Sequence, residues 1–285
     1  MVDLHGAKAG EPGGDRGPET AFIVFDTESV VDGALLSRVL YPGEGLSPED
    51  AAAKERKARL EDSDGSSDFI AVTFHVPVSI SVARVAADFR LLDVVALDAP
   101  RFDPRQMVSL FWKGVARYRG SVLVDFNGRS FDLPLLTLAA FRFGISCPRY
   151  FADGDRFGFR YRFTSSHIDL MEWLTEYGAY RMKGGLNLLA KMLGKPGKMS
   201  TRGDQVDALY RAGALREISD YCTQDVLDTY FIFLRTRVLT GQITLEDEQR
   251  LVAEARSWLQ ERSKTQPGLE PYLENFGIWN PEPFL

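Results

Sequence analysis

The sequence has few residues of the kinds that bind zinc or form disulfides. Its 285 residues include two cysteines, Cys147 and Cys222, and three histidines, and there is no CxxC motif. A disulfide framework is therefore excluded, a structural zinc site is disfavoured, and a reducing cytoplasm is the expected compartment. No run reaches the roughly 18 apolar residues that a membrane-spanning helix needs, and we expect no membrane partner.

The sequence also lacks a surplus of basic residues. Its net charge is −6 and its pI is near 5.3, which argues against a protein that coats nucleic acid without selectivity. One segment, residues 178–202, nevertheless contains basic residues and no acidic ones. It is either a solvated helix and loop or a local surface that contacts phosphates. Its basic residues are Arg181, Lys183, Lys191, Lys195, Lys198 and Arg202.

Composition divides the chain into three parts. Residues 1–19 are rich in Gly, Asp and Glu and have no apolar signal segment, so we expect a disordered leader. Residues 20–240 form the main domain, with a charged insertion at 41–68 that is mobile or partly ordered and that contains a surface helix from Pro48 to Leu60. Residues 241–285 contain an amphipathic helix at 245–261 and a tail with Tyr272, Phe276, Trp279 and Phe284, which packs either on the body or on a partner.

Hydrophobic periodicity indicates the class of fold. It predicts strands at 21–28, 89–96, 122–126 and 167–170, and one or two strands within 69–84. It predicts helices at 103–119, 132–143, 186–193 and 218–239. Strands come first and then alternate with helices, which is typical of an α/β fold with a mixed sheet.

Two acidic residues stand at the end of the first predicted strand, in Asp26-Thr27-Glu28. Side chains alternate along a strand, so Asp26 and Glu28 leave from the same face. Two carboxylates about 4 Å apart repel by roughly 4 kcal/mol at an effective dielectric constant near 20. Either one of them is protonated or a cation lies between them, and oxygen ligands suit Mg²⁺ or Mn²⁺.

Two further segments contain carboxylates beside predicted strands and helices. Asp132 follows the strand at 122–126 and begins a helix, and Tyr221 and Asp225 share a face of the long helix because they are four residues apart. Taken singly, each segment has an ordinary explanation. Asp26 and Glu28 can mark a strand that meets solvent, Asp132 can cap its helix, and Tyr221 and Asp225 can be helix surface.

Together, in this order and at these intervals, the three segments resemble the Exo I, Exo II and Exo III motifs of DEDDy 3′-5′ exonucleases. They are most similar to the proofreading domains of B-family DNA polymerases and their stand-alone bacterial relatives. The related DEDDh group has a histidine five residues before the last Asp, where this chain has Asp220. The matches are Asp26 and Glu28 to Asp-x-Glu, Asn127, Phe131 and Asp132 to Asn-x-x-x-Phe-Asp, and Tyr221 and Asp225 to Tyr-x-x-x-Asp.

The resemblance implies a ribonuclease H-like fold, with a five-stranded mixed sheet flanked by helices, and two divalent ions, Mg²⁺ or Mn²⁺. It implies that Asp26 bridges both ions, that Glu28 and Asp225 complete the first site, and that Asp132 holds the second. Tyr221 would position the attacking water. The implied activity is hydrolysis of single-stranded DNA or RNA from the 3′ end to nucleoside 5′-monophosphates.

The resemblance and the local sequence also suggest contacts to the substrate. Thr27 would contact the terminal nucleotide, and Lys183 and Lys198 would contact the incoming strand. Phe131 would stack on a base or serve as a core aromatic residue, and Asn127 would bind a sugar or phosphate or shape its loop. Two alternatives to the implied activity stay open: an RNA-trimming exoribonuclease on the same site, and a catalytically inactive nucleic-acid-binding module.

Overall fold

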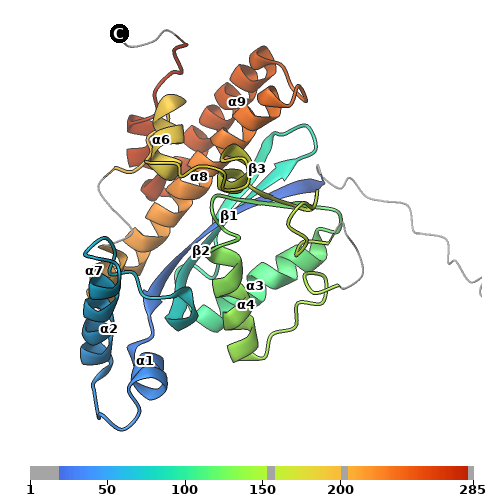
Figure 1. The fold of residues 1–285 in the computed structure, drawn as a ribbon. Helices are drawn as coiled ribbons and strands as arrows, with labels where there is room; N and C mark the ends of the chain where they lie inside the picture. The colour runs from blue at the N-terminus through green and yellow to red at the C-terminus, as the bar shows by residue number, and fades with distance from the viewer. Residues whose placement is uncertain (1–18, 153–157, 200–204, 282–285) are drawn as a thin grey trace, which may run out of the picture.

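A computed structural model describes residues 19–152, 158–199 and 205–281 (Figure 1). The predicted disordered leader lies outside the described residues except for Glu19, and so do Arg202 and Phe284. The strands are β1 (Thr20–Val31), β2 (His75–Ala86), β3 (Leu91–Ala96), β4 (Val122–Asp125) and β5 (His167–Asp169).

The helices are distributed along the whole described chain and cover both faces of the sheet (Figure 1). The α-helices are α1 (Gly33–Leu40), α2 (Pro48–Asp62), α3 (Pro104–Arg117), α4 (Asp132–Phe143), α5 (Leu170–Leu174), α6 (Gly185–Met192), α7 (Val206–Arg211), α8 (Leu215–Leu239), α9 (Leu245–Ser263) and α10 (Glu270–Glu274). Two short 3₁₀ helices are η1 (Val72–Phe74) and η3 (Pro267–Leu269).

The strands form one mixed sheet in the order β3-β2-β1-β4-β5. β1 lies at the centre, antiparallel to β2 and parallel to β4, while β3 is antiparallel to β2 and β5 is parallel to β4. This arrangement confirms the predicted α/β fold with a five-stranded mixed sheet flanked by helices, consistent with the ribonuclease H-like class. The antiparallel register places Asp26 opposite Ser81 and Glu28 opposite Ser79.

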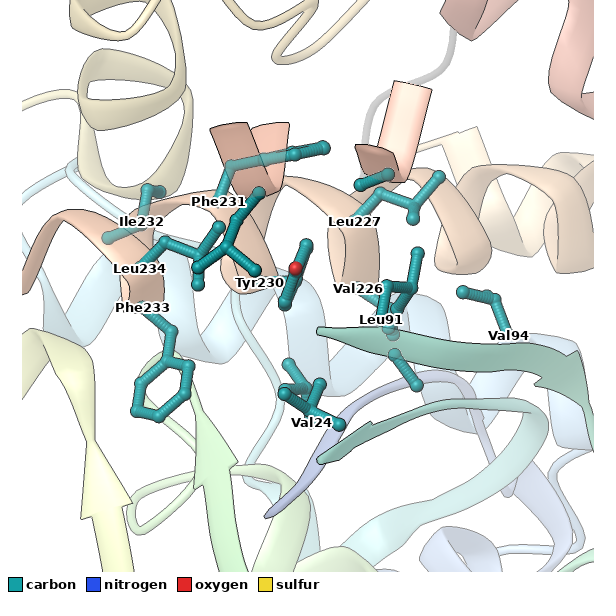
Figure 2. Packing of buried hydrophobic residues seen from close by; sticks show 14 of the residues in the cluster. Val24, Leu91, Val94, Val226, Leu227, Tyr230, Phe231, Ile232, Phe233 and Leu234 are labelled. Carbon is teal, nitrogen blue, oxygen red and sulfur yellow. The ribbon is translucent and has the colours of Figure 1, made fainter. Parts of the chain in front are cut away.

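The sheet separates two hydrophobic cores, and alternate residues of β1 point into each. Val24 belongs to the core under α8, which β3 also lines through Leu91 and Val94 (Figure 2). Phe25 belongs to the core under α3 and α4, where its ring lies 4.9 Å from that of Phe111. Because the alternation continues along the strand, Asp26 and Glu28 face α8, whereas Thr27 faces α4.

The predicted insertion at 41–68 contains α2, which is packed against α1. Ser47 caps α2 by accepting a hydrogen bond from the Asp50 backbone N–H, and Pro48 occupies the first turn. α1 is an element that periodicity did not predict. The two helices enclose a small core of their own, formed by Leu36, Ala51, Ala52 and Ile70.

The C-terminal segment packs on the body rather than standing apart from it. Leu251 and Leu259 of α9 and Tyr272 of α10 are buried in the same core as α8. The Tyr272 hydroxyl donates a hydrogen bond to Asp228 Oδ1 of α8 at 2.8 Å. Within the described part of the chain, no helix combines the length and apolar character needed to cross a bilayer.

Candidate active site

Residues almost 200 positions apart meet where β1 passes under α8. Asp26 and Glu28 from β1 and Asp225 from α8 each offer a carboxylate oxygen, and these oxygens all lie within 4.8 Å of one another. Asp225 is buried, and the other two are partly buried. The backbone carbonyl of Asp26 also accepts a hydrogen bond from Cys222 Sγ at 3.3 Å, one turn before Asp225 on α8.

The electrostatics of this cluster favour a bound cation. Burial raises the pKa of Asp26 well above its usual value, and repulsion from Asp132, Asp225 and Glu28 raises it further. Burial and the charge of Asp225 act in the same direction on the pKa of Glu28. The pKa of Asp225 rises to about 6, again because of burial. A group of acidic oxygen ligands that is only partly buried matches the ligand preference of Mg²⁺ or Mn²⁺.

Asp132 approaches the cluster from the first turn of α4. Its Oδ1 accepts a hydrogen bond from Thr27 Oγ1 at 2.5 Å. The residue between the two β1 acids therefore holds the start of α4, where Asp132 lies. Burial and the nearby Asp125 raise the pKa of Asp132 to about 7, although the Thr27 hydrogen bond opposes that rise. The Thr27 side chain therefore contacts Asp132, on the α4 side of the sheet.

Tyr221 lies one turn before Asp225 on α8. It is buried in a small core with Val30, Val78 and Ile218, and its hydroxyl hydrogen-bonds the Asp225 carboxylate. Burial and the neighbouring carboxylates raise the pKa of Tyr221 far above that of a free tyrosine. The phenol is therefore a hydrogen-bonding group that stays protonated at neutral pH.

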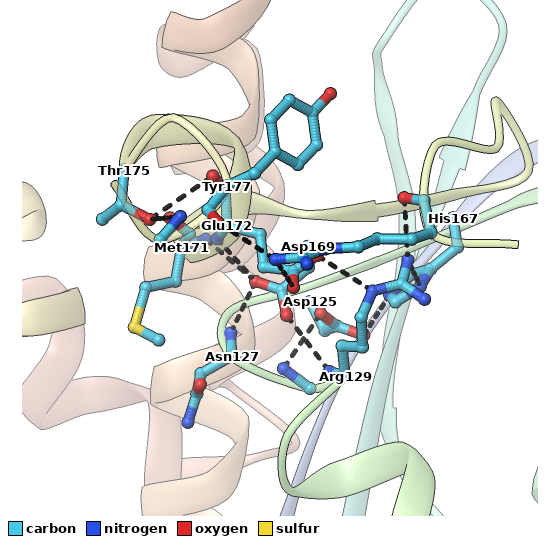
Figure 3. Close-up of polar contacts among 12 residues, drawn as sticks. Asp125, Asn127, Arg129, His167, Asp169, Met171, Glu172, Thr175 and Tyr177 are labelled. Atoms are coloured by element: carbon cyan, nitrogen blue, oxygen red, sulfur yellow. Dashed lines mark hydrogen bonds and ion pairs between the residues drawn. The ribbon is translucent and has the colours of Figure 1, made fainter. Parts of the chain in front are cut away.

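The loop before Asp132 is held by acidic residues that the sequence analysis did not select (Figure 3). Asp169, at the end of β5, accepts hydrogen bonds from the backbone N–H groups of Asn127 and Arg129 at 3.0 and 3.1 Å. Asp125, at the end of β4, accepts from the Gly128 N–H at 3.1 Å. A Cβ at position 128 would lie 2.3 Å from Asp125 Oδ2, so only glycine fits there.

A buried histidine supports this loop from behind (Figure 3). Arg129 Nη2 lies 2.9 Å from His167 Nδ1, and because a guanidinium only donates, Nδ1 is the acceptor. Nε2 then carries the ring proton and donates to Asp125 Oδ2 at 2.7 Å. The only sequence signal for these supports is that two apolar strands each end in Asp; the structure shows that the two strands pair and that Asp125 lies opposite Asp169.

The predicted substrate-contacting residues occupy different positions around the site. Asn127 has a left-handed φ of 68° and its side chain points away from the Asp169 network (Figure 3). Phe131 occupies the N-cap position of α4, makes no capping hydrogen bond with its side chain, and is partly buried. Lys198 is exposed and its charge lowers the pKa values of Glu28 and Asp225, so its ammonium lies near the carboxylates. Lys183 is exposed on the segment that leads into α6.

One basic residue of the 178–202 segment differs from both interpretations of that segment. Lys195 is 4% exposed, so it neither lies in solvent nor contacts phosphates from the surface. Its ammonium lies 4.0 Å from the ring centroid of Phe276 and 5.0 Å from that of Phe231. Burial lowers its pKa to about 8. The aromatic C-terminal segment thus accommodates this lysine in the interior.

The mixed sheet, with acidic residues converging from β1, α4 and α8, is the arrangement expected of the nuclease class that the three motifs indicate. The chain belongs to the family described as predicted 3′-5′ exonucleases related to the exonuclease domain of PolB, whose model matches residues 67–276. The matched range contains Asp132, Tyr221 and Asp225, whereas Asp26 and Glu28 precede it. No curated protein matches the chain significantly.

Proposed function

We propose that this chain is a metal-dependent 3′-5′ exonuclease that hydrolyses single-stranded nucleic acid to nucleoside 5′-monophosphates. The observation that carries the proposal is the convergence of Asp26, Glu28 and Asp225 within 4.8 Å in a chain of this family. At this spacing, three charged carboxylates that are buried or partly buried repel one another strongly unless a cation or protons lie between them.

The carboxylates would hold two divalent ions, Mg²⁺ or Mn²⁺. Asp26 would contact both, Glu28 and Asp225 would complete the first site, and Asp132 would hold the second. A pair of such ions lowers the pKa of an attacking water and stabilises the leaving oxygen in phosphodiester hydrolysis. Thr27 supports this assignment, because its hydrogen bond holds Asp132 against the residue that lies between the two β1 acids.

Tyr221 would orient the attacking water by hydrogen bonding. Its hydroxyl is fixed by Asp225 and by the core around its ring. Because its raised pKa keeps the phenol protonated, it would serve as an orienting group rather than as the general base.

Lys198 would contact a phosphate of the substrate beside the acidic cluster. Its ammonium already lies close enough to Glu28 and Asp225 to lower their pKa values. Its loop is fixed by the Lys198 backbone N–H, which donates to Asn187 Oδ1 at 2.8 Å. Asn127 and Lys183 would contact the strand farther out.

An RNA-trimming exoribonuclease would use the same residues and would differ in preferring a 2′-OH at the 3′ end. A catalytically inactive nucleic-acid-binding module would keep the fold without turnover. The close carboxylate cluster favours an enzyme, because without a bound cation it costs stability through repulsion and desolvation.

The test is digestion of 5′-labelled single-stranded DNA and RNA of the same sequence in Mg²⁺ or Mn²⁺. We expect a ladder that shortens from the 3′ end and disappears with EDTA or with Asp26→Ala. Glu261→Ala, a change at an exposed acid on α9, is the matched control and should leave the ladder intact. Tight oligonucleotide binding without any ladder would favour the inactive binding module, and faster digestion of RNA would favour the exoribonuclease.

A further inference from the structure

Three aromatic rings, those of Phe69, His75 and Phe131, gather at the start of α4. Phe69, in the segment before η1, has 54% of its surface exposed. Its ring centroid lies 5.5 Å from that of His75 and 6.1 Å from that of Phe131. The His75 and Phe131 rings meet edge to face, with their centroids 6.0 Å apart.

Two of these rings are joined to segments that carry proposed metal ligands, one along the chain and one through a hydrogen bond. Phe131 immediately precedes Asp132. His75 Nδ1 lies 2.9 Å from the hydroxyl of Ser29, the residue that follows Glu28. The rings therefore lie between β1 and the start of α4, the helix that carries Asp132, and Phe69 forms their exposed part.

The position of Phe69 is fixed rather than left to a free loop. The next residue, Ile70, is 2% exposed in the core that α1 and α2 enclose. Its backbone carbonyl lies 3.1 Å from His75 Nε2. Because a carbonyl only accepts, Nε2 carries the ring hydrogen and donates this hydrogen bond. His75 Nδ1 then accepts from Ser29, so the imidazole is held from both sides. α1, together with α2 of the 41–68 insertion, thus supports an exposed ring near the start of α4.

We propose that Phe69 is a stacking site for an unpaired base near the 3′ end of the substrate. This inference rests on the proposed exonuclease activity. An exposed aromatic face whose neighbouring ring, Phe131, immediately precedes Asp132 suits the flat, apolar face of a base, and such stacking tolerates any sequence. It also gives the 41–68 insertion a role, since α1 and α2 hold Phe69 in place through Ile70.

The test uses single-stranded DNA with 2-aminopurine at each of the last three positions in turn and a phosphorothioate at the 3′-terminal linkage to slow hydrolysis. With the wild-type protein in Mg²⁺, we expect stacking to quench the fluorophore at one or more of these positions. Phe69→Ala should abolish that quench and raise KM about five- to hundredfold, as loss of one stacked base predicts. Its kcat should change little, because Phe69 contacts none of the proposed metal ligands.

Two further variants separate stacking from general destabilisation. Phe69→Tyr retains an aromatic face and should retain both the quench and the wild-type KM. Phe141→Ala removes a ring that is 87% exposed on α4 and should behave as wild type. Two results would overturn the inference: a wild-type protein that gives a 3′ ladder but no quench, and a Phe69→Ala protein with unchanged KM and quench. Either result would indicate that the exposed Phe69 ring binds a protein partner instead of a base. Absence of a ladder from the wild-type protein would instead refute the proposed function on which the inference rests.

Discussion

Replacing Asp225 with asparagine should stabilise the metal-free protein while abolishing hydrolysis. Burial raises the pKa of Asp225 from 3.8 to about 6, so in the folded protein its ionised form is disfavoured relative to the unfolded chain. Each pKa unit corresponds to about 1.4 kcal/mol, and the rise therefore costs about 3 kcal/mol at a pH well above 6. An asparagine removes this charge and keeps an oxygen that can accept the Tyr221 hydrogen bond.

The pH dependence of the effect follows from the direction of the pKa shift. The folded protein holds the Asp225 proton more tightly than the unfolded chain does, so wild-type stability falls as the pH rises from about 4 through about 6. Asparagine does not titrate in this range. The difference in the free energy of unfolding between Asp225→Asn and wild type should therefore be near zero at pH 4 and reach about 3 kcal/mol in favour of the variant at pH 8.

The measurement is thermal or urea unfolding in EDTA across this pH range, with and without Mg²⁺ or Mn²⁺. At pH 8 in EDTA, the variant should melt about 6 °C above wild type, at about 2 °C per kcal/mol for a chain of this size. Added metal should stabilise wild type and do much less for the variant, because one proposed ligand is lost. Glu261→Gln, at an exposed acid, should show neither effect. A variant that is less stable than wild type at pH 8 in EDTA would refute the argument. A stability difference between the two proteins that is the same at pH 4 and pH 8 would also refute it.

Two further predictions concern groups that orient the site. Tyr221→Phe should slow turnover about 10- to 100-fold, because the phenol contacts Asp225. Metal should still stabilise this variant against heating, because Tyr221 is not a proposed metal ligand. An unchanged kcat would remove Tyr221 from the mechanism. Thr27→Val keeps the shape of the buried side chain but removes the donor to Asp132, so kcat should fall about 10- to 100-fold and Thr27→Ser should restore it. Equal activity of the Val and Ser variants would show that the hydrogen bond has no catalytic consequence.

The elements with strong periodicity were predictable from sequence. α4 begins at Asp132 and ends at Phe143 as expected, because the proline in its first turn and Gly144 after it mark both ends. α8 was found from its long apolar pattern and begins at Leu215, slightly earlier than predicted. α1, α5, α7 and α10 were not predicted, because short helices offer few turns in which a period can appear; α6, equally short, was predicted with the help of Gly194 and Pro196, which mark its end.

The acidic residues near the site were predictable only in part. Asp26, Glu28, Asp132 and Asp225 were selected because three segments appear in a characteristic order. Asp125 and Asp169 were not, because their role depends on which strands pair and on backbone N–H groups of a loop that no motif describes. The burial of Lys195 was equally hidden, since it depends on a C-terminal aromatic residue folding back onto α8.

The central strand β1 makes the site sensitive to the insertion or deletion of a single residue, a change that substitutions do not mimic. Because successive residues of β1 alternate between the two cores, one residue inserted or deleted just before Asp26 would exchange the two sides. Thr27 would then face α8, and both acids would point toward the aromatic core around Phe111. Homologous chains should therefore vary in length in the loops around β1 but not between Phe22 and Glu28, a constraint on length rather than on residue identity.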